Sequence, residues 1–419
     1  MAGRPSRAAR AHPDAAGAPD SWVERTARRR RAWLGRTASL VAVAFLGAPA
    51  AAAEAVEAPA HSRDDKPSIG LVIGGWRFAL HETNNARTEC PDGFQYKQAQ
   101  NYAAQFPTPE ARKAHGERFG YYVNRGPNGE NVFYFPTVVT DPLPFRPAQG
   151  PTAIGLDLDG EQDGKGTAET LPHENFTSPE GRKGVDNQLY RVIGCTPGWR
   201  KGGMIDGIVS SYIRSETQPR LLLEITGVDD ERNDPEVTVT TYRGLDPIAA
   251  DSKGGLIPWL SQRIDYRGGA RYVQRFRGRI VDGVLVTEPT DVRLPYYEQP
   301  DMAGDRIIRR MRLELRLTPG GAEGLLGGYA DLENWYLNYA KTWGAHAIAD
   351  VEGWSAPATY RALHGFADFR DPETGQVTGI SAAYEVAFTR AFIIHSPKGE
   401  AAIAARLAPL EPPRAMASR

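Results

Sequence analysis

The stretch RMRLELRLTP, residues 310–319, decides the fold class because its side chains alternate between apolar and charged at every position up to Leu317. Successive side chains of an extended strand point to opposite faces. The alternation therefore predicts a strand with one face in a core and the other in water, as is typical of antiparallel sheets. The apolar positions are Met311, Leu313, Leu315 and Leu317, and the charged ones are Arg310, Arg312, Glu314 and Arg316.

Four further segments extend this pattern. RLLLEITGV (220–228) and EVTVTTYRG (236–244) are rich in β-branched residues and are joined by the polar DDERNDP, which predicts a hairpin or two neighbouring strands. RYVQRFRGRIVDGVLVTEP (271–289) turns at Val281-Asp282-Gly283, a strong hairpin signal. GISAAYEVAFTRAFII (379–394) predicts a strand near the end of the chain.

Helices are predicted at only three places. They are KQAQNYAAQF (97–106), TPEARKAHGERFG (108–120) and ADLENWYLNYAKTWG (330–344), the last with an apolar stripe that indicates core packing. The chain also holds 44 glycines and 32 prolines, which suit many turns. Together these features predict a mainly β protein, an antiparallel, sandwich-like architecture with a few short helices.

Length and charge limit the function classes. At 419 residues with 41% hydrophobic content, the chain can bury a large core as one big domain or two ordinary ones. Residues 1–53 hold nine arginines against three acidic residues, a local charge of +6. The overall charge of −1 therefore leaves −7 for residues 54–419. This mildly acidic remainder gives no basis for nucleic-acid binding.

The basic N-terminus has the pattern of an export signal. RRRRAWLGR (28–36) precedes an apolar stretch of about a dozen residues and then the small residues Ala51 to Ala53, a pattern typical of a signal peptide over residues 1–53. The adjacent arginines also fit a twin-arginine signal, and the sequence leaves that choice open. The apolar stretch is shorter than the ~20 residues of a transmembrane helix, so the mature protein is expected to have no transmembrane segment and to be periplasmic or secreted.

The mature chain is expected to fall into four parts. Residues 54–67 are a predicted linker, 68–203 a loop-rich first lobe, 204–399 a strand-rich second lobe and 400–419 a disordered tail. The boundary between the lobes is placed at PGWRKGG (197–203) because it is rich in turn residues.

Export determines how the two cysteines are interpreted. Cys90 and Cys195 are the only two, and an oxidising compartment favours a disulfide between them. Two buried free thiols, or one nucleophile, remain as alternatives. The spacing gives no support for a metal, redox or haem motif.

The segment GLDLDGEQDGKG (155–166) is acidic and rich in glycine. Its carboxylates recur at every second position and its glycines allow sharp turns, so several carboxylates could converge on a cation. Oxygen ligands alone suit Ca²⁺. An EF-hand is excluded because the sixth position from the first aspartate is Gln162 and the twelfth is Ala168. The predicted ligands are Asp157, Asp159, Asp163, Asp186 and Asn187. The alternative is a solvated acidic turn in which the aspartates cap their own backbone.

Catalytic motifs are absent from the sequence. There is no G-x-S-x-G elbow, and HETNN (81–85) lacks the second histidine of a zinc protease. His81 is the histidine best placed for a role, because a predicted strand ends beside it in a polar loop. A pair of carboxylates could still perform glycoside chemistry at a separation of about 5 to 9.5 Å. Whether the protein is an enzyme is therefore left undecided.

Three motifs carry a resemblance to other proteins. They are ECPDG (89–93), SPEGRKGVDNQLYRVIGC (178–195) and DPETGQVTGISAAYEVAFTRAF (371–392). Together they resemble a group of uncharacterised exported bacterial proteins. The resemblance covers most of the mature chain and implies a shared fold and export, and it carries over no catalytic residue.

Two hypotheses about function follow. The first is a non-catalytic exported binding or accessory protein, a β-sandwich stabilised by a cation and a disulfide, whose ligand the sequence does not identify. The second is an extracytoplasmic hydrolase or lyase that uses carboxylates on a polysaccharide, since tryptophan and tyrosine can stack on sugars.

Overall fold

A computed structural model describes residues 67–114, 128–213, 220–299, 302–340, 353 and 355–404. All of them belong to one compact unit, Ala58–Arg419. The predicted signal peptide (1–53) and all but the last residue of the predicted linker (54–67) lie outside the described residues.

The described part is built from eleven strands and short helices. The strands are β1 Ile69–Phe78, β2 Arg220–Thr226, β3 Asp234–Gly244, β4 Leu260–Arg263, β5 Arg275–Val281, β6 Val284–Thr287, β7 Thr290–Gln299, β8 Met302–Thr318, β9 Gly321–Asp331, β10 Phe369–Arg370 and β11 Val377–Ile394. The helices are α2 Gln98–Gln105, α3 Pro109–Ala114, α4 Gln188–Ile193, α5 Met204–Tyr212, α6 Leu332–Ala340, α8 Ala356–Gly365 and α9 Pro397–Ala404, with 3₁₀ turns η1 Pro197–Trp199 and η2 Tyr266–Tyr272.

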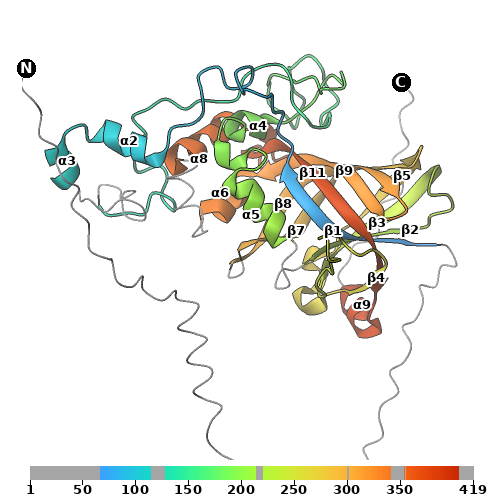
Figure 1. The fold of residues 1–419 in the computed structure, drawn as a ribbon. Coiled ribbons are helices and arrows are strands. Elements are labelled where there is room, and N and C mark those ends of the chain that lie inside the picture. The colour runs from blue at the N-terminus through green and yellow to red at the C-terminus, as the bar shows by residue number, and fades with distance from the viewer. Residues whose placement is uncertain are drawn as a thin grey trace, which may run out of the picture. The chain divides into compact units, whose positions relative to one another are not determined.

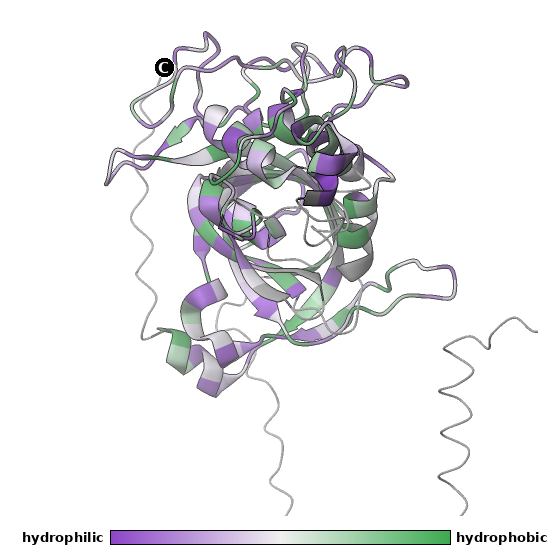
Figure 2. Cartoon of the chain, turned by 90° about the vertical axis from the view of Figure 1, so that its left-hand side faces the viewer, coloured by the Kyte–Doolittle hydropathy of each residue, from purple (hydrophilic) through white to green (hydrophobic). Residues whose placement is uncertain are grey.

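The main sheet closes on itself. Its order is β1-β2-β3-β5-β6-β8-β9-β11, and β1 pairs with both β2 and β11, always antiparallel. Viewed along the sheet, these strands form a ring (Figure 2). The predicted mainly β, antiparallel and sandwich-like architecture with a few short helices is confirmed. The pairing of β1 with β11 joins the two ends of the strand order.

The deciding stretch lies in β8 and behaves as predicted. Met311, Leu313 and Leu315 are buried in the core inside the ring, and Leu317 is partly buried against it. The charged residues between them are half-buried or exposed. Because the period is two, this single pattern determines which face of the strand points inward.

The predicted hairpin turn at Val281-Asp282-Gly283 is confirmed. Asp282 and Gly283 join β5 to β6 with φ values of 49° and 76°. Two consecutive positive φ angles are typical of a type I′ turn, for which Asp-Gly is a favoured pair.

The three predicted helices are confirmed within the described residues, as α2, α3 and the start of α6. Residues 115–120 and 341–344 of the predicted spans lie outside that part. In α6 the aromatic residues Trp335, Tyr336 and Tyr339 are buried, as core packing requires. Helices α4, α5, α8 and α9 were not predicted, and Figure 1 shows α4, α6 and α8 gathered near one end of β1 and β11.

The predicted lobes share one sheet. β1 lies in the segment 68–203, and its partners β2 and β11 lie in 204–399. The predicted disordered tail (400–419) begins too early, because α9 runs to Ala404. Residues 405–419 lie outside the described part. Among the described helices, none combines the length and the apolar character needed to cross a membrane.

The core has one large interior cluster and two smaller ones outside the ring. One outer cluster includes Tyr242, Ile264 and Ile403. The other consists of Leu156, Leu158, Tyr329 and Phe369, and it fixes the acidic segment against β9. This second outer cluster positions the candidate site.

Candidate metal centre

The acidic segment lies close against the outer face of the sheet because glycines leave room for it. A Cβ added at Gly155 would lie 2.9 Å from Val185 Cγ1, and one added at Gly327 of β9 would lie 3.0 Å from Leu156 Cδ1. From the other side, the Arg312 guanidinium donates hydrogen bonds of 2.8 Å to the carbonyls of residues 157 and 158. The first part of the segment, residues 155–158, is thus fixed against the sheet, whereas residues 160–163 and 165 are exposed, as in the alternative of a solvated acidic turn.

Two of the predicted ligands come together, and a histidine joins them. The ligand atoms of Asp159, His173 and Asp186 all lie within 4.8 Å of one another. The Asp186 side chain is fully buried and that of His173 is only 6% exposed. Asp186 Oδ1 lies 2.8 Å from His173 Nε2, and its Oδ2 accepts a hydrogen bond of 2.7 Å from the Leu158 amide.

His173 is held as an imidazolium in this geometry. Its Nδ1 lies 2.7 Å from the carbonyl of Leu171, which can only accept, and its Nε2 faces the Asp186 carboxylate. Burial lowers the pKa of His173, but the hydrogen bonds to Asp186 and Leu171 outweigh it and raise the pKa to about 9. A metal ion at Nε2 would therefore have to displace one proton.

Asp159 contributes from the edge of the cluster. Its Oδ2 accepts a hydrogen bond of 2.8 Å from the Thr170 hydroxyl, and its Oδ1 accepts one of 2.9 Å from the Glu161 amide. Asp159 is half-buried, so it links the buried pair to the surface.

The other three predicted ligands have structural roles. Asp157 caps the turn at Gly160 with a hydrogen bond of 2.7 Å, and Asp163 forms an exposed ion pair of 2.5 Å with Lys165. Asn187 is the N-cap of α4: its oxygen accepts from the Tyr190 amide, and its nitrogen donates to two backbone carbonyls. The five predicted residues therefore do not converge on one point, because these three satisfy local backbone groups.

A further buried carboxyl lies next to the centre. Asp368 is 1% exposed and accepts hydrogen bonds from the amide and the hydroxyl of Ser381, at 2.6 and 2.5 Å. Burial raises the pKa of Asp368 to about 7, although the hydrogen bonds from Ser381 and the charge of His173 oppose it. Sequence reasoning missed Asp368 because it lies 182 positions after Asp186 (186 to 368).

Tyr329 of β9 carries a buried polar atom beside the acidic segment, since it packs in one cluster with Leu156 and Leu158. The side chain is 1% exposed, and among the described residues its hydroxyl has no hydrogen-bond partner. Burial, together with the carboxylates of Asp186, Asp368 and Asp159, raises the pKa of Tyr329. A buried hydroxyl without a partner is costly, and this one lies within the field of the carboxylates.

The donor set favours a transition-metal ion over Ca²⁺. Ca²⁺ takes six to eight oxygen ligands, whereas imidazole nitrogen suits zinc, copper, iron and nickel. A pocket of about 990 Å³, lined by His173, Asn175 and Arg191 among others, borders the centre at His173. Residues Asp159, His173 and Asp186 could hold such an ion.

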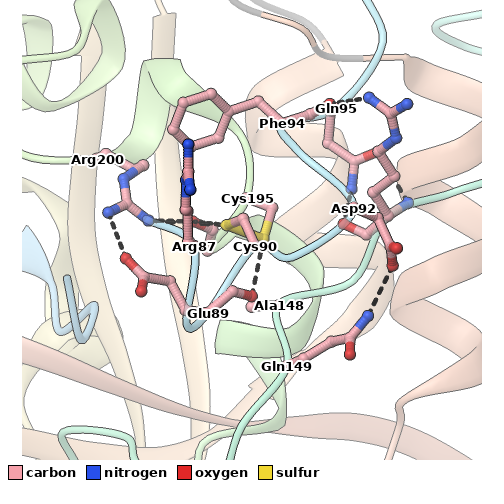
Figure 3. The surroundings of a disulfide bond; sticks show 12 residues. Arg87, Glu89, Cys90, Asp92, Phe94, Gln95, Ala148, Gln149, Cys195 and Arg200 are labelled. Carbon is pink, nitrogen blue, oxygen red and sulfur yellow. Dashed lines mark hydrogen bonds and ion pairs between the residues drawn. A yellow bond between two sulfur atoms is a disulfide. The ribbon is translucent and has the colours of Figure 1, made fainter. Parts of the chain in front are cut away.

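The predicted disulfide is confirmed. Cys90 and Cys195 are bonded with an S–S distance of 2.13 Å and a Cα–Cα distance of 5.7 Å. Figure 3 shows Arg200 directed toward both Glu89 and the disulfide. The Glu89–Arg200 ion pair is 2.7 Å long. Burial raises the pKa of Glu89, but hydrogen bonds from Thr83 and Arg200 outweigh it and lower the pKa to about 2.

Comparisons of the chain with protein-family models, with curated proteins and with solved structures found no match. The function is therefore argued from the geometry of this chain alone.

Proposed function

We propose that this is an exported, non-catalytic binding protein whose ligand is a transition-metal ion held by Asp159, His173 and Asp186. The observation that carries the proposal is the convergence of two carboxylates and an imidazole within 4.8 Å, with the Asp186 and His173 side chains buried. Buried charged groups are normally paired with each other or coordinate metals.

The surroundings of the three side chains support metal binding. The carbonyl of Leu171 orients the His173 ring through Nδ1, which leaves Nε2 directed at the ion position, as second-sphere hydrogen bonds do in metal sites. Backbone amides orient Asp186 in the same way. Placement outside the cytoplasm, in the periplasm or in the medium, is supported by the Cys90–Cys195 disulfide and by the arginine-rich, apolar N-terminus.

The test is a competitive loading experiment on the mature protein. Metal-free protein is mixed with equal amounts of Zn²⁺, Mn²⁺, Fe³⁺ as its nitrilotriacetate complex, and Ca²⁺, then desalted, and the retained metals are measured by mass spectrometry. We expect about one transition-metal ion per chain, because the three donors converge on one position. We expect no Ca²⁺, because one donor is an imidazole and Ca²⁺ takes six to eight oxygen ligands.

Matched variants locate the site. Asp186→Asn should lose the ion because it removes a buried anionic ligand, and Asp163→Asn should retain it because that side chain pairs with Lys165 at the surface. Retention of no transition metal by the wild-type protein would overturn the proposal.

A second candidate function is carboxylate-dependent cleavage of a polysaccharide. A pocket of about 500 Å³ over β1, β9 and β11 is lined by Glu323 and Glu385 and by three glycines. Glu385 pairs with Leu325, and Ala387 pairs with Glu323, so the two glutamates are diagonal neighbours on the outer face. The Cα atoms of diagonal neighbours lie about 7–8 Å apart, so the two flexible side chains can place their carboxyl groups at the separation of about 5 to 9.5 Å that glycosidases use.

The environment of Glu385 matches that of a general acid. It is half-buried, and burial raises its pKa although the charges of Arg77 and Lys201 oppose the shift. Incubation with a panel of polysaccharides, followed by a reducing-sugar assay, tests this candidate. Activity that Glu385→Gln abolishes would support it, and no activity on any member would count against it.

A further inference from the structure

The metal centre has a fourth donor, and this inference rests on the metal-binding function proposed above. We propose that Tyr329 binds the ion through its phenolate oxygen, and that the ion this centre selects is ferric iron. The ligand set is then two carboxylates, one imidazole and one phenolate.

The hydroxyl of Tyr329 is buried without a partner. The residue is only 1% exposed, and its hydroxyl makes no hydrogen bond to any of the described residues. Native proteins pair nearly all such groups, and an exception calls for an explanation such as an ion. Tyr329 packs with Leu158, whose amide donates a hydrogen bond of 2.7 Å to Asp186, so its side chain lies beside the group that would hold that ion.

The ring of Tyr329 is also held in place by its neighbours. Its ring stacks on Phe369 with centroids 4.5 Å apart and an interplanar angle of 20°. It packs with Leu156 and Leu158 of the acidic segment, and Leu158 directly precedes Asp159. In the β9–β11 register it lies opposite Ser381, whose hydroxyl is bonded to Asp368. A ring fixed on several sides keeps its hydroxyl directed at one place.

The charges of the four donors also favour a trivalent ion. The carboxylates of Asp159 and Asp186 and the Tyr329 phenolate carry three negative charges, and neutral His173 carries none. A buried site is stabilised when its charges are compensated, and a trivalent ion compensates these three. Anionic oxygen donors are hard ligands that suit a hard ion. Fe³⁺ is such an ion, and it is the stable form of iron under the oxidising conditions in which disulfides persist.

Binding of Fe³⁺ releases two protons to solvent, one from Nε2 of His173 and one from the Tyr329 hydroxyl. The iron enters from its nitrilotriacetate complex, and the free chelator leaves. No electron is transferred, because the iron arrives and stays ferric. Asp368 stays outside the ligand set, because it does not belong to the group whose ligand atoms all lie within 4.8 Å of one another.

The experiment uses metal-free mature protein titrated with Fe³⁺–nitrilotriacetate, followed by visible absorption and by iron content after desalting. The wild-type protein should hold one iron and show a phenolate-to-iron charge-transfer band. Tyr329→Phe should lose the band and bind iron at least about tenfold more weakly, a loss typical of changes at metal sites. Tyr384→Phe is the matched control: Tyr384 is equally buried, lacks a hydroxyl partner among the described residues, and belongs to the core inside the ring. It should keep both the band and the iron.

The outcomes separate the two proposals. If the wild-type protein retains a transition metal but shows no band with iron, or if Tyr329→Phe keeps the band, the phenolate ligand is overturned and the metal-binding function stands. If the wild-type protein retains no metal at all, both are overturned. Circular dichroism of Tyr329→Phe confirms that the variant folds, and its retention of Zn²⁺ shows that the other three ligands are intact.

Discussion

Removing the disulfide should cost a large part of the stability of this protein. Cys90 and Cys195 are separated by 105 positions. In the chain-entropy model, the cross-link of a loop of that length restricts the unfolded chain by about 4 to 5 kcal/mol. A globular protein has a free energy of unfolding of only about 5 to 15 kcal/mol. The double variant Cys90→Ser, Cys195→Ser should therefore lie close to its unfolding limit.

The assay is urea unfolding followed by tryptophan fluorescence. The double variant should unfold at lower urea than the oxidised wild-type protein, and with a steeper slope, because an unfolded chain without the cross-link exposes more surface. Reductant should shift the wild-type transition to that of the double variant and should leave the double variant unchanged. A loss of less than about 1 kcal/mol on removing the bond would refute the entropic reasoning.

Three further changes test other parts of the structure. Burial lowers the pKa of His395, but its hydrogen bonds to Glu224 and Glu400 outweigh this and raise the pKa to about 10. The resulting stabilisation is present in full below pH 6.5, the pKa of histidine in the unfolded chain, and is lost as the pH rises toward 10. His395→Gln should therefore flatten the dependence of melting temperature on pH in this range, and an unchanged profile would contradict the reasoning. The pH dependence contributed by Glu89 has the opposite sign, because its pKa is lowered from 4.5 to about 2: this contribution to stability is present above pH 4.5 and is lost as the pH falls through 2. Glu89→Gln should therefore lose less stability in acid than the wild-type protein, and identical acid transitions would exclude this contribution. Gly155→Val should force the acidic segment off the sheet, cost about 1–3 kcal/mol and weaken metal retention; wild-type retention would show that the close approach is unnecessary.

The strands were predictable because alternation is local. In β8 and in the β5–β6 hairpin, the side chains or turn residues of a few consecutive positions determine the structure. The closure of the sheet was not predictable, since no local pattern in β1 specifies β11 as its second partner.

The candidate site was predictable only in part. Asp159 stood out because it belongs to the acidic segment, whereas His173 follows no metal-ligand spacing and was missed. Its position between the predicted ligands Asp159 and Asp186 was the available signal. Tyr329 and Asp368 come from distant parts of the chain, so only the fold brings them to the centre.

Asn187 shows how a structural role can be mistaken for a ligand. It precedes the apolar turn QLYRVI and Gly194 follows that turn, a pattern of N-cap and helix end that predicts α4. The Asn187 oxygen accepts from the Tyr190 amide and its nitrogen donates to two backbone carbonyls, so the side chain is held at the start of α4. The N-cap pattern should therefore have taken precedence over the count of oxygen donors.

The pairing of β1 with β11 also constrains the order of folding. Leu71 lies opposite Arg390, so the contact that closes the ring joins residues more than 300 positions apart (71 to 390). Contacts of such long sequence separation form slowly, because the intervening chain must be ordered first. Until β11 docks, β1 and β9 present unpaired edges that could pair with other chains. A circular permutant in which a short linker joins β11 to β1 and the chain is reopened at the 282–283 turn would make this contact local, and we expect it to fold faster than the natural chain order.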